Sequence, residues 1–407
     1  MNTEKRYLWN SRNSELQGAC LFTWRDVVTR DLQAIPERHW KRIVSATISE
    51  VQRWKVATLD ESVKRFYELL VSSRPDSIPD NEEQFDHRHF CLLPSFNLSG
   101  STIADRALMC SAVAYCLAFD LDGVSISDLN RLRLSAMTLE LYEIIDTKSE
   151  DVHPDLAQIH ELVRSEAESL FDSIWNLAGD AAFIKPEYPE SGEYSLEGML
   201  YCAAMISSNR FGMREGKWKR PNPTAPYEVE RAIESIEDKT AFHNHPLAES
   251  ARAIGDRKVA LVYGGATKIK AYFLESARLP EVRGASTLLD QINLEDTPAL
   301  FGGPQDSLPN PERRKEVRLK FKERAKLTRE IDAPECVIYA NGGNILAFAP
   351  VSAASELAQE IENIYTRETL VANSSAVCEA FDLIELHYGL RPASYWATDF
   401  IEDCKDD

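Results

Sequence analysis

Apolar residues in the first half of the chain recur with the period of amphipathic helices. Between Leu59 and Val71, apolar side chains return every three or four positions, which places them on one face of a helix. The same reasoning predicts helices over 101–119, 125–145, 153–179 and 195–211. Polar, proline-bearing segments separate them, at 72–83, 185–194 and 216–228. We therefore predict a mostly helical domain over residues 1–250.

Three features refine these helices. Segment 101–119 is apolar and alanine-rich on most sides, which predicts a helix buried in the core. Ser127 or Asp128 is the expected N-cap of the next helix, because short polar side chains accept hydrogen bonds from the first backbone N–H groups. Gly179 is expected to end the helix over 153–179, since glycine readily adopts the left-handed conformation found at helix ends.

The pattern changes near Asp256, where short apolar runs alternate with amphipathic segments. The expected elements are, in order, a strand at 258–265, helical pattern over 267–292 and 311–331, a hairpin at 336–350, a helix over 352–371 and a strand at 380–390. Reduced to its core, this order is βαββαβ, the ferredoxin-like arrangement. We expect an α+β chain with a ferredoxin-like domain over residues 256–395, followed at 396–407 by an acidic tail or the start of a further domain.

The segment 336–350, CVIYANGGNILAFAP, consists of two apolar runs split by Asn-Gly-Gly-Asn. Asn and Gly tolerate the positive φ of a tight turn, so the segment predicts a β-hairpin. In polymerase-like palm domains, a carboxylate at such a hairpin and another at the end of the first strand hold two divalent metal ions. Here the hairpin carries Asn344 and Ile345, and the first strand ends in Gly264-Gly265. We therefore expect no metal site and no catalysis by this domain alone.

Composition argues against several classes of protein, among them membrane proteins and proteins held together by disulfides. The 407 residues are 44% hydrophobic and carry a net charge of −19, which argues against a surface that binds nucleic acid as a whole. There is no run of about 18 apolar residues and no apolar leader, so we expect a cytoplasmic protein without a membrane partner. The eight cysteines are scattered without a CxxC pair, which favours reduced, buried thiols.

One segment departs from the acidic balance. Residues 313–329 contain nine Lys or Arg and two Glu. A solvated helix face explains such a segment, and so does contact with an RNA backbone or with an acidic partner surface. Its only aromatic residue is Phe321, so base stacking is not the expected mode of contact. The candidate contact residues are Arg313, Arg314, Lys315, Arg318, Lys320 and Lys322.

Three segments of the second half of the chain form a specific pattern: Ile269–Phe273 after the first strand, Arg283-Gly-Ala-Ser286 before a Leu-rich stretch, and the Tyr-x-x-Gly-Gly-Asn hairpin. In these segments the chain resembles the first palm domain in the large subunit of type III CRISPR effector complexes. The resemblance covers about residues 256–395, whereas the first 250 residues match only loosely. In that family the large subunit carries two palms. The first usually has a degenerate hairpin, and the second makes cyclic oligoadenylates from ATP.

The resemblance implies an inactive first palm that supports nucleotide binding, assembly and target-RNA signalling. ATP lies between the two palms in that family, so the candidate nucleotide contacts are Arg283, Ser286, Gly342, Gly343 and Asn344. Turn and helix-cap roles account for the same residues equally well. The chain itself requires no cofactor, while ATP and Mg²⁺ belong to the full subunit. The implied partners are other CRISPR effector subunits, guide RNA and target RNA.

The family often carries an N-terminal HD nuclease, whose metal site needs a His-Asp pair. Here Asp86-His87 has the reverse order and no His-Asp dipeptide occurs, while His153 and His160 share one predicted helix face. We interpret residues 1–250 as a domain without that metal site, whether or not it is a remnant of the HD domain. Because Asp407 follows closely on the expected end of the palm, the chain is either part of a longer subunit or a short relative.

Three alternatives stay open. The chain fits the large subunit of a DNA-targeting, type I-D-like complex, in which the palm is purely structural. It also fits an autonomous protein whose cyclase-like domain senses nucleotides. A stand-alone nucleotidyltransferase is the enzyme alternative, and the missing carboxylates argue against it.

Overall fold

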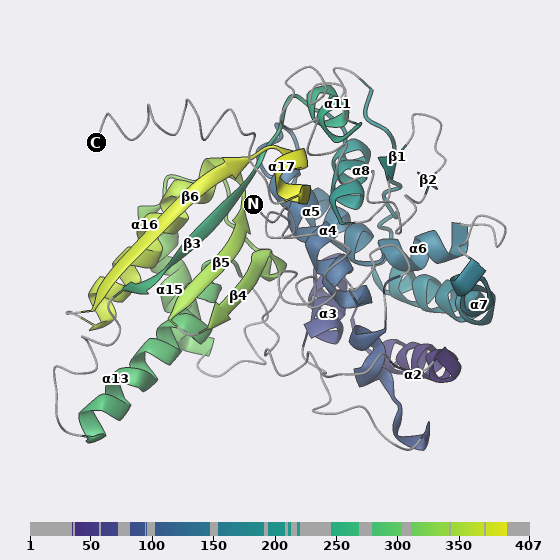
Figure 1. Ribbon diagram of the computed structural model, residues 1–407, viewed down its shortest axis with the longest axis horizontal. Coiled ribbons are helices and arrows are strands. Elements are labelled where there is room, and N and C mark those ends of the chain that lie inside the picture. The colour runs from purple at the N-terminus through teal and green to yellow at the C-terminus, as the bar shows by residue number, and fades with distance from the viewer. Residues whose placement is uncertain are drawn as a thin grey trace, which may run out of the picture.

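The computed structural model describes residues 35, 37–56, 58–71, 82–93, 95, 102–146, 154–190, 194–207, 211–212, 218–219, 246–267, 279–302, 311–341, 343–369 and 372–388. They form a helical part, on the right in Figure 1, and a four-stranded sheet with its own helices, on the left. The chain is therefore α+β, as the hydrophobic pattern predicts. None of the helices in these ranges is long and apolar enough to cross a membrane.

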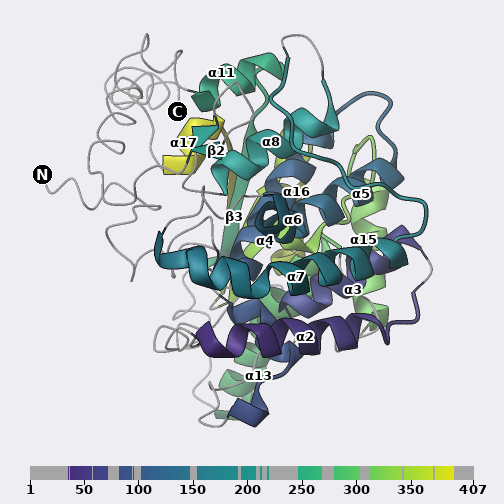
Figure 2. The same cartoon turned by 90° about the vertical axis from the view of Figure 1, so that its right-hand side faces the viewer.

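The helical part follows the predicted pattern closely. Its main helices are α2 (Trp40–Val51), α3 (Leu59–Val71), α4 (Ile103–Ala118), α5 (Ile126–Met137), α6 (Leu139–Asp146), α7 (Pro154–Leu177), α8 (Leu196–Ile206) and α11 (Pro246–Ala253). Short 3₁₀ turns lie at η3 (Glu37–His39), η4 (Glu82–Gln84) and η5 (His87–Leu92), and β1 (Phe211–Gly212) pairs with β2 (Trp218–Lys219). All 16 residues of α4 are buried, and α2 and α7 lie side by side outside it (Figure 2). An apolar helix at the centre of the core is thus confirmed.

The predicted helix over 125–145 is two helices, α5 and α6, separated at Thr138. Its N-cap is Ser125 rather than Ser127 or Asp128. The Ser125 hydroxyl accepts a hydrogen bond from the backbone N–H of Asp128, and the Asp128 carboxylate accepts one from the N–H of Ser125. This reciprocal capping box needs the acidic residue three positions inside the helix, which explains the error. Gly179 follows α7 with a φ of 72°, in agreement with its predicted role.

Four strands form one antiparallel sheet in the order β4-β5-β3-β6. They are β3 (Val259–Thr267), β4 (Val337–Asn341), β5 (Asn344–Ala349) and β6 (Asn373–Phe381). Between β3 and β4 lie α13 (Leu279–Gln291), the π-helical turn η7 (Ile292–Asp296), α14 (Thr297–Ala299), α15 (Pro311–Arg324) and η8 (Pro334–Cys336). The helix α16 (Val351–Thr369) joins β5 to β6. The predicted hairpin and the helix after it are confirmed.

The predicted final strand at 380–390 is wrong. The strand there is β6, which ends at Phe381, and it is followed by the short helix α17 (Leu383–Tyr388). β6 pairs with β3 along its whole length, so backbone hydrogen bonds and not apolar side chains define it. The apolar residues Leu383 and Leu386 instead lie buried in α17, which packs against α8 and α11. A polar start, Asn373-Ser-Ser, hid the strand from the hydrophobic pattern.

α16 covers one face of the sheet and leaves the other partly open (Figure 1). Ile361 of α16 lies against Gly264 of β3, so the alternation of side chains along the strand places Tyr263 on the opposite side. We call that side the open face. Across it, one row of paired positions contains Tyr339, Leu346, Tyr263 and Val377. Tyr263 and Val377 are 45% and 60% exposed, and they are neighbours in this row.

The helical part and the sheet part meet where α4 packs against η8, β3 and β5. Arg133 of α5 and Glu335 of η8 form an ion pair there, and both side chains are almost completely buried. Arg329, just beyond α15, donates hydrogen bonds to the backbone carbonyls of Val124 and Leu121. Charged groups out of water need such partners, so these contacts hold the two parts in one arrangement.

Candidate nucleotide site at the β-hairpin

The hairpin between β4 and β5 is closed by pairing of Asn341 with Asn344. Gly343 has a φ of 91°, which a glycine adopts without strain, as the sequence predicts for this turn. Its carbonyl oxygen accepts a hydrogen bond from the backbone N–H of Ala266 at 2.8 Å. The turn is therefore bonded to β3. Gly342, the other glycine predicted to contact a nucleotide, lies outside the described residues.

The position where a palm needs its first carboxylate is occupied by Gly265, directly opposite Asn344. A Cβ atom on Gly265 would lie 2.1 Å from the carbonyl oxygen of Gly343 and 2.7 Å from Cα of Asn344. Both neighbours are backbone atoms, which do not move aside as the tip of a side chain does. Gly265 is thus required for the close approach of β3 to the hairpin, and no side chain fits there.

Gly264 is closed to side chains for a different reason. It pairs with Ile345 on one side and with Ala376 on the other. A Cβ atom on Gly264 would lie 2.6 Å from Cβ of Ala376 and 3.1 Å from the Ile361 side chain of α16. β3 also continues to Thr267, so the two glycines lie inside the strand and do not mark its exit. The sheet therefore places Gly264 and Gly265 beside Ile345 and Asn344. Neither glycine has a side chain that could bind a metal ion.

Of the four positions Gly264, Gly265, Asn344 and Ile345, only Asn344 has a polar side chain, and that side chain is half-buried. An amide oxygen is a neutral ligand, and hard divalent cations bind preferentially to several oxygens including charged ones. Within the described residues, no group of three or more His, Cys, Asp or Glu is placed to hold a metal ion. Gly264, Gly265, Asn344 and Ile345 therefore lie on neighbouring strands and offer no charged ligand to a metal ion.

Arg283 and Ser286 lie inside α13, which begins at Leu279. The expectation that they flank a helix start is therefore wrong by about one turn, because the helix already includes Leu279-Pro280 and proline is well accommodated in a first turn. Arg283 is exposed and Ser286 is half-buried. Within the described part of the chain neither side chain has a hydrogen bond or an ion pair, so both are available to a ligand.

Sequence reasoning missed two residues behind the hairpin. The hydroxyl of Tyr365 on α16 donates a hydrogen bond to the amide oxygen of Asn293 in η7, and it lies 3.2 Å from the carbonyl oxygen of Gly343. Burial raises the pKa of Tyr365 well above its usual value, so the hydroxyl keeps its proton. Both residues are almost completely buried. They fix the turn relative to η7 and α16.

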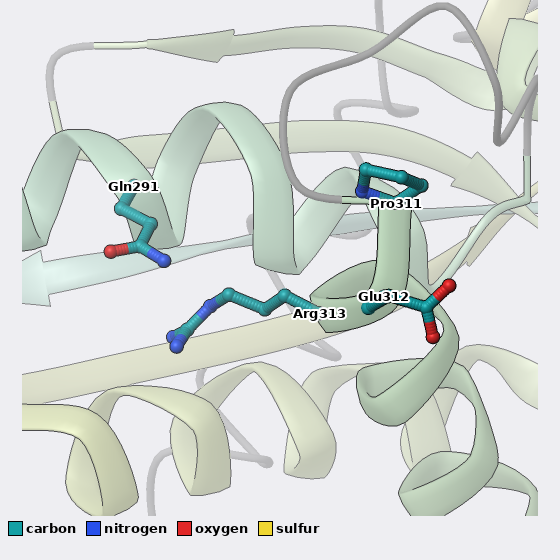
Figure 3. Close-up of a pocket in the computed structure, with 4 residues that line it drawn as sticks. All are labelled: Gln291, Pro311, Glu312 and Arg313. Atoms are coloured by element: carbon teal, nitrogen blue, oxygen red, sulfur yellow. The ribbon is translucent and has the colours of Figure 1, made fainter.

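A pocket of about 460 Å³ lies at the start of α15, lined by Gln291, Pro311, Glu312 and Arg313 (Figure 3). Arg313 is its only cation among these residues. The Arg313 guanidinium donates to Asp296 at 2.7 Å and to Glu368 at 2.9 Å. These carboxylates raise the pKa of Arg313 despite its partial burial, and they neutralise its charge. None of the four lining residues therefore offers an unpaired positive charge to a phosphate group.

The basic segment is largely paired within the chain. Lys315 bonds to Glu312, Lys320 to Glu316, and both Arg318 and Lys322 to Glu330. Arg314 is 5% exposed, which removes it from any surface contact. α15 itself ends at Arg324, short of the predicted 331. Lys315 and Lys322 remain exposed, and contact of these residues with RNA or a partner stays a prediction.

Among the described residues of the N-terminal part, no histidine belongs to a group placed to hold a metal ion. His89 is 1% exposed, and its Nδ1 lies 3.1 Å from the Asp86 carboxylate at the start of η5. Its ring packs edge-on against Phe85, which in turn stacks on His39. Such contacts are those of core histidines. His153 and the side chain of His160 lie outside the described residues.

Comparison of the sequence with protein-family models and with curated proteins found no match.

Proposed function

We propose that the chain is the N-terminal part of the large subunit of an RNA-guided type III CRISPR complex, with an inactive first palm. The strand order β4-β5-β3-β6, with α13 and α16 as connections, supports a ferredoxin-like palm, since the first strand lies between the third and the fourth. The hairpin residues quoted for the resemblance join the second and third strands of this sheet. In this proposal the chain acts in the cytoplasm as an assembly subunit.

The observation that carries the proposal is the pairing of Gly265 with Asn344. It brings together the two places from which a catalytic palm extends its carboxylates, and backbone atoms fill the space that a side chain on Gly265 needs. This packing leaves no room for a metal-binding carboxylate at Gly265, and a palm that only supports a neighbour needs none there. The site therefore favours a supporting role over nucleotide transfer.

The open face supports an assembly role. Its exposed Tyr263 and Val377 lie beside the half-buried Tyr339 and Leu346, and these four side chains carry no charge at neutral pH. Exposed apolar patches of this kind mark protein interfaces more often than nucleic-acid surfaces. A second palm is the partner that the resemblance implies for this face. Arg283, exposed on α13 and unpaired among the described residues, is then a candidate contact to a nucleotide phosphate.

Incubation of the purified chain with ATP and Mg²⁺ or Mn²⁺ tests the absence of catalysis. The expected result is no cyclic or linear oligoadenylate, because no carboxylate pair holds the metals. Formation of such products by the chain alone would show that the palm is active. A heat-treated sample and a chain carrying Arg283→Glu serve as controls for contaminating activity, since a true activity must respond to the variant.

Co-expression with the remainder of the large subunit, which carries the second palm, with the other effector subunits and with a guide RNA tests the assembly role. The expected result is a ribonucleoprotein that retains the tagged chain through size-exclusion chromatography. The double variant Tyr263→Glu with Val377→Glu places charges on the open face and is expected to release the chain from the complex while its circular dichroism spectrum is unchanged. A chain that purifies alone, without RNA or subunits, would instead favour the autonomous sensor.

A further inference from the structure

Two buried thiols meet where the helical part joins the sheet part. Cys116 is on α4 and Cys336 is in η8, and they are 3% and 0% exposed. Their Sγ atoms lie 3.9 Å apart, although 220 positions separate the residues in the chain. Scattered cysteines with no sequence motif are thus paired by the fold.

Hydrogen bonds beside the two cysteines hold them close to each other. Glu335, the residue before Cys336, accepts hydrogen bonds from Arg133 and from the Ser111 hydroxyl, at 2.7 Å each. Ser111 is on α4, the helix that carries Cys116. The two thiols therefore cannot drift apart without breaking a buried ion pair, and a buried charge left without its partner is costly.

We propose that Cys116 and Cys336 are a redox-sensitive pair, which hydrogen peroxide converts into a disulfide that locks the helical part onto the sheet part. One thiolate attacks a peroxide oxygen and becomes a sulfenic acid, and hydroxide leaves. The second thiol loses its proton and attacks that sulfur, and the sulfenic oxygen leaves as water. Both sulfur atoms are oxidised, and both oxygens of the peroxide are reduced to water.

The geometry suits this oxidant. A disulfide requires the sulfur atoms to close to about 2.0 Å, which is a shift of roughly 2 Å from their present separation. The pair is almost completely covered, so a small neutral oxidant reaches it more readily than a bulky disulfide reagent. Burial also raises the pKa of the Cys336 thiol, which lowers its thiolate fraction and makes the reaction slow. The pair is therefore expected to stay reduced until exposure to peroxide is sustained.

The disulfide has a measurable consequence for stability. It joins residues 220 positions apart and so closes a long loop of the chain. A longer closed loop restricts the unfolded chain more strongly. The melting temperature of the oxidised chain is expected to rise by about 5 °C relative to the reduced chain.

Peptide mapping of the full chain tests the proposal. The chain is reduced, freed of reductant, treated with hydrogen peroxide, alkylated and digested without reductant. The expected result is a crosslinked peptide pair containing Cys116 and Cys336, which disappears after treatment with dithiothreitol, together with the rise in melting temperature. Unlinked alkylated peptides, or Cys336 found only as sulfinic or sulfonic acid, overturn the proposal.

Matched variants separate the disulfide from other effects of peroxide. Cys116→Ser and Cys336→Ser are each expected to lose the peroxide-dependent rise in melting temperature. Cys202→Ser removes another completely buried thiol, on α8, and is expected to retain that rise. A rise that persists in Cys116→Ser assigns the effect to other groups and overturns the proposal. Because the mapping uses the unaltered chain, it decides the question even where a variant fails to fold.

Discussion

Arg133 on α5 and Glu335 in η8 form a bidentate ion pair that joins the helical part of the chain to the sheet part. Nε and Nη2 of Arg133 donate to the two carboxylate oxygens of Glu335 at 2.7 and 2.8 Å. Burial opposes the charge of the guanidinium, yet Glu335 raises the pKa of Arg133 above its usual value. Ser111 supplies a third donor to the same carboxylate. A contact between residues 202 positions apart therefore holds the two parts in one arrangement.

Removal of one partner of this pair is expected to be strongly destabilising. Glu335→Leu leaves Arg133 as a buried charge without its carboxylate, and the free energy of unfolding should fall by about 3–5 kcal/mol. Urea denaturation followed by circular dichroism measures the change. The double variant Arg133→Met with Glu335→Leu is the control, and it should lose less than Glu335→Leu alone. Equal loss in both would contradict the assignment of the cost to an unpaired charge.

The contact between Gly265 and the hairpin predicts a sharp difference between two glycines. Gly265→Ala should lower the free energy of unfolding by about 2 kcal/mol or more, because its Cβ would meet the Gly343 carbonyl oxygen. Gly284→Ala is the matched control, since nothing lies within 4 Å of its Cβ and it is inside α13. Alanine there should stabilise the chain by about 0.5–1 kcal/mol. Thermal unfolding of both variants checks the prediction.

Restoration of carboxylates at the hairpin alone should not create an enzyme. The double variant Asn344→Asp with Ile345→Asp supplies acids on β5, while Gly264 and Gly265 on β3 still supply none. Two-metal catalysis needs ligands from both strands, so ATP turnover with Mg²⁺ or Mn²⁺ should stay at background. Chromatography of the reaction products measures it. Cyclic oligoadenylates from this variant would mean that one strand suffices.

The capping box of α5 predicts a pH dependence. Hydrogen bonds from the Ser125 hydroxyl and backbone N–H hold the pKa of Asp128 below its usual range. A lowered folded-state pKa means that this contribution to stability is present above the unfolded pKa of about 3.9 and is lost as the pH falls through the folded value. Asp128→Asn should therefore be less stable than the original chain at pH 7, and the difference should shrink below pH 4. Urea titrations at the two pH values test this, and a constant difference would contradict it.

Much of the helical part could be predicted from local pattern. The spacing of Val63, Phe66 and Leu70 alone places them on the buried face of α3, and the apolar, alanine-rich character of most of α4 predicts its central place. Local pattern misled where polar residues form a strand, as at Ser374 and Ser375 in β6. There the backbone of β3 decides the structure, because a strand edge offers hydrogen bonds whatever the side chains are.

The amino-acid sequence by itself determined most of the helices, the first strand of the sheet, the hairpin turn and the absence of acids from Gly264, Gly265, Asn344 and Ile345. Only the tertiary structure decided that Gly265 faces Asn344, that Tyr365 lies behind the turn, and that Cys116 meets Cys336. These contacts join residues from distant parts of the chain, and local periodicity carries no information about such pairs. The packing of α16 on the sheet and of α4 on η8 creates them.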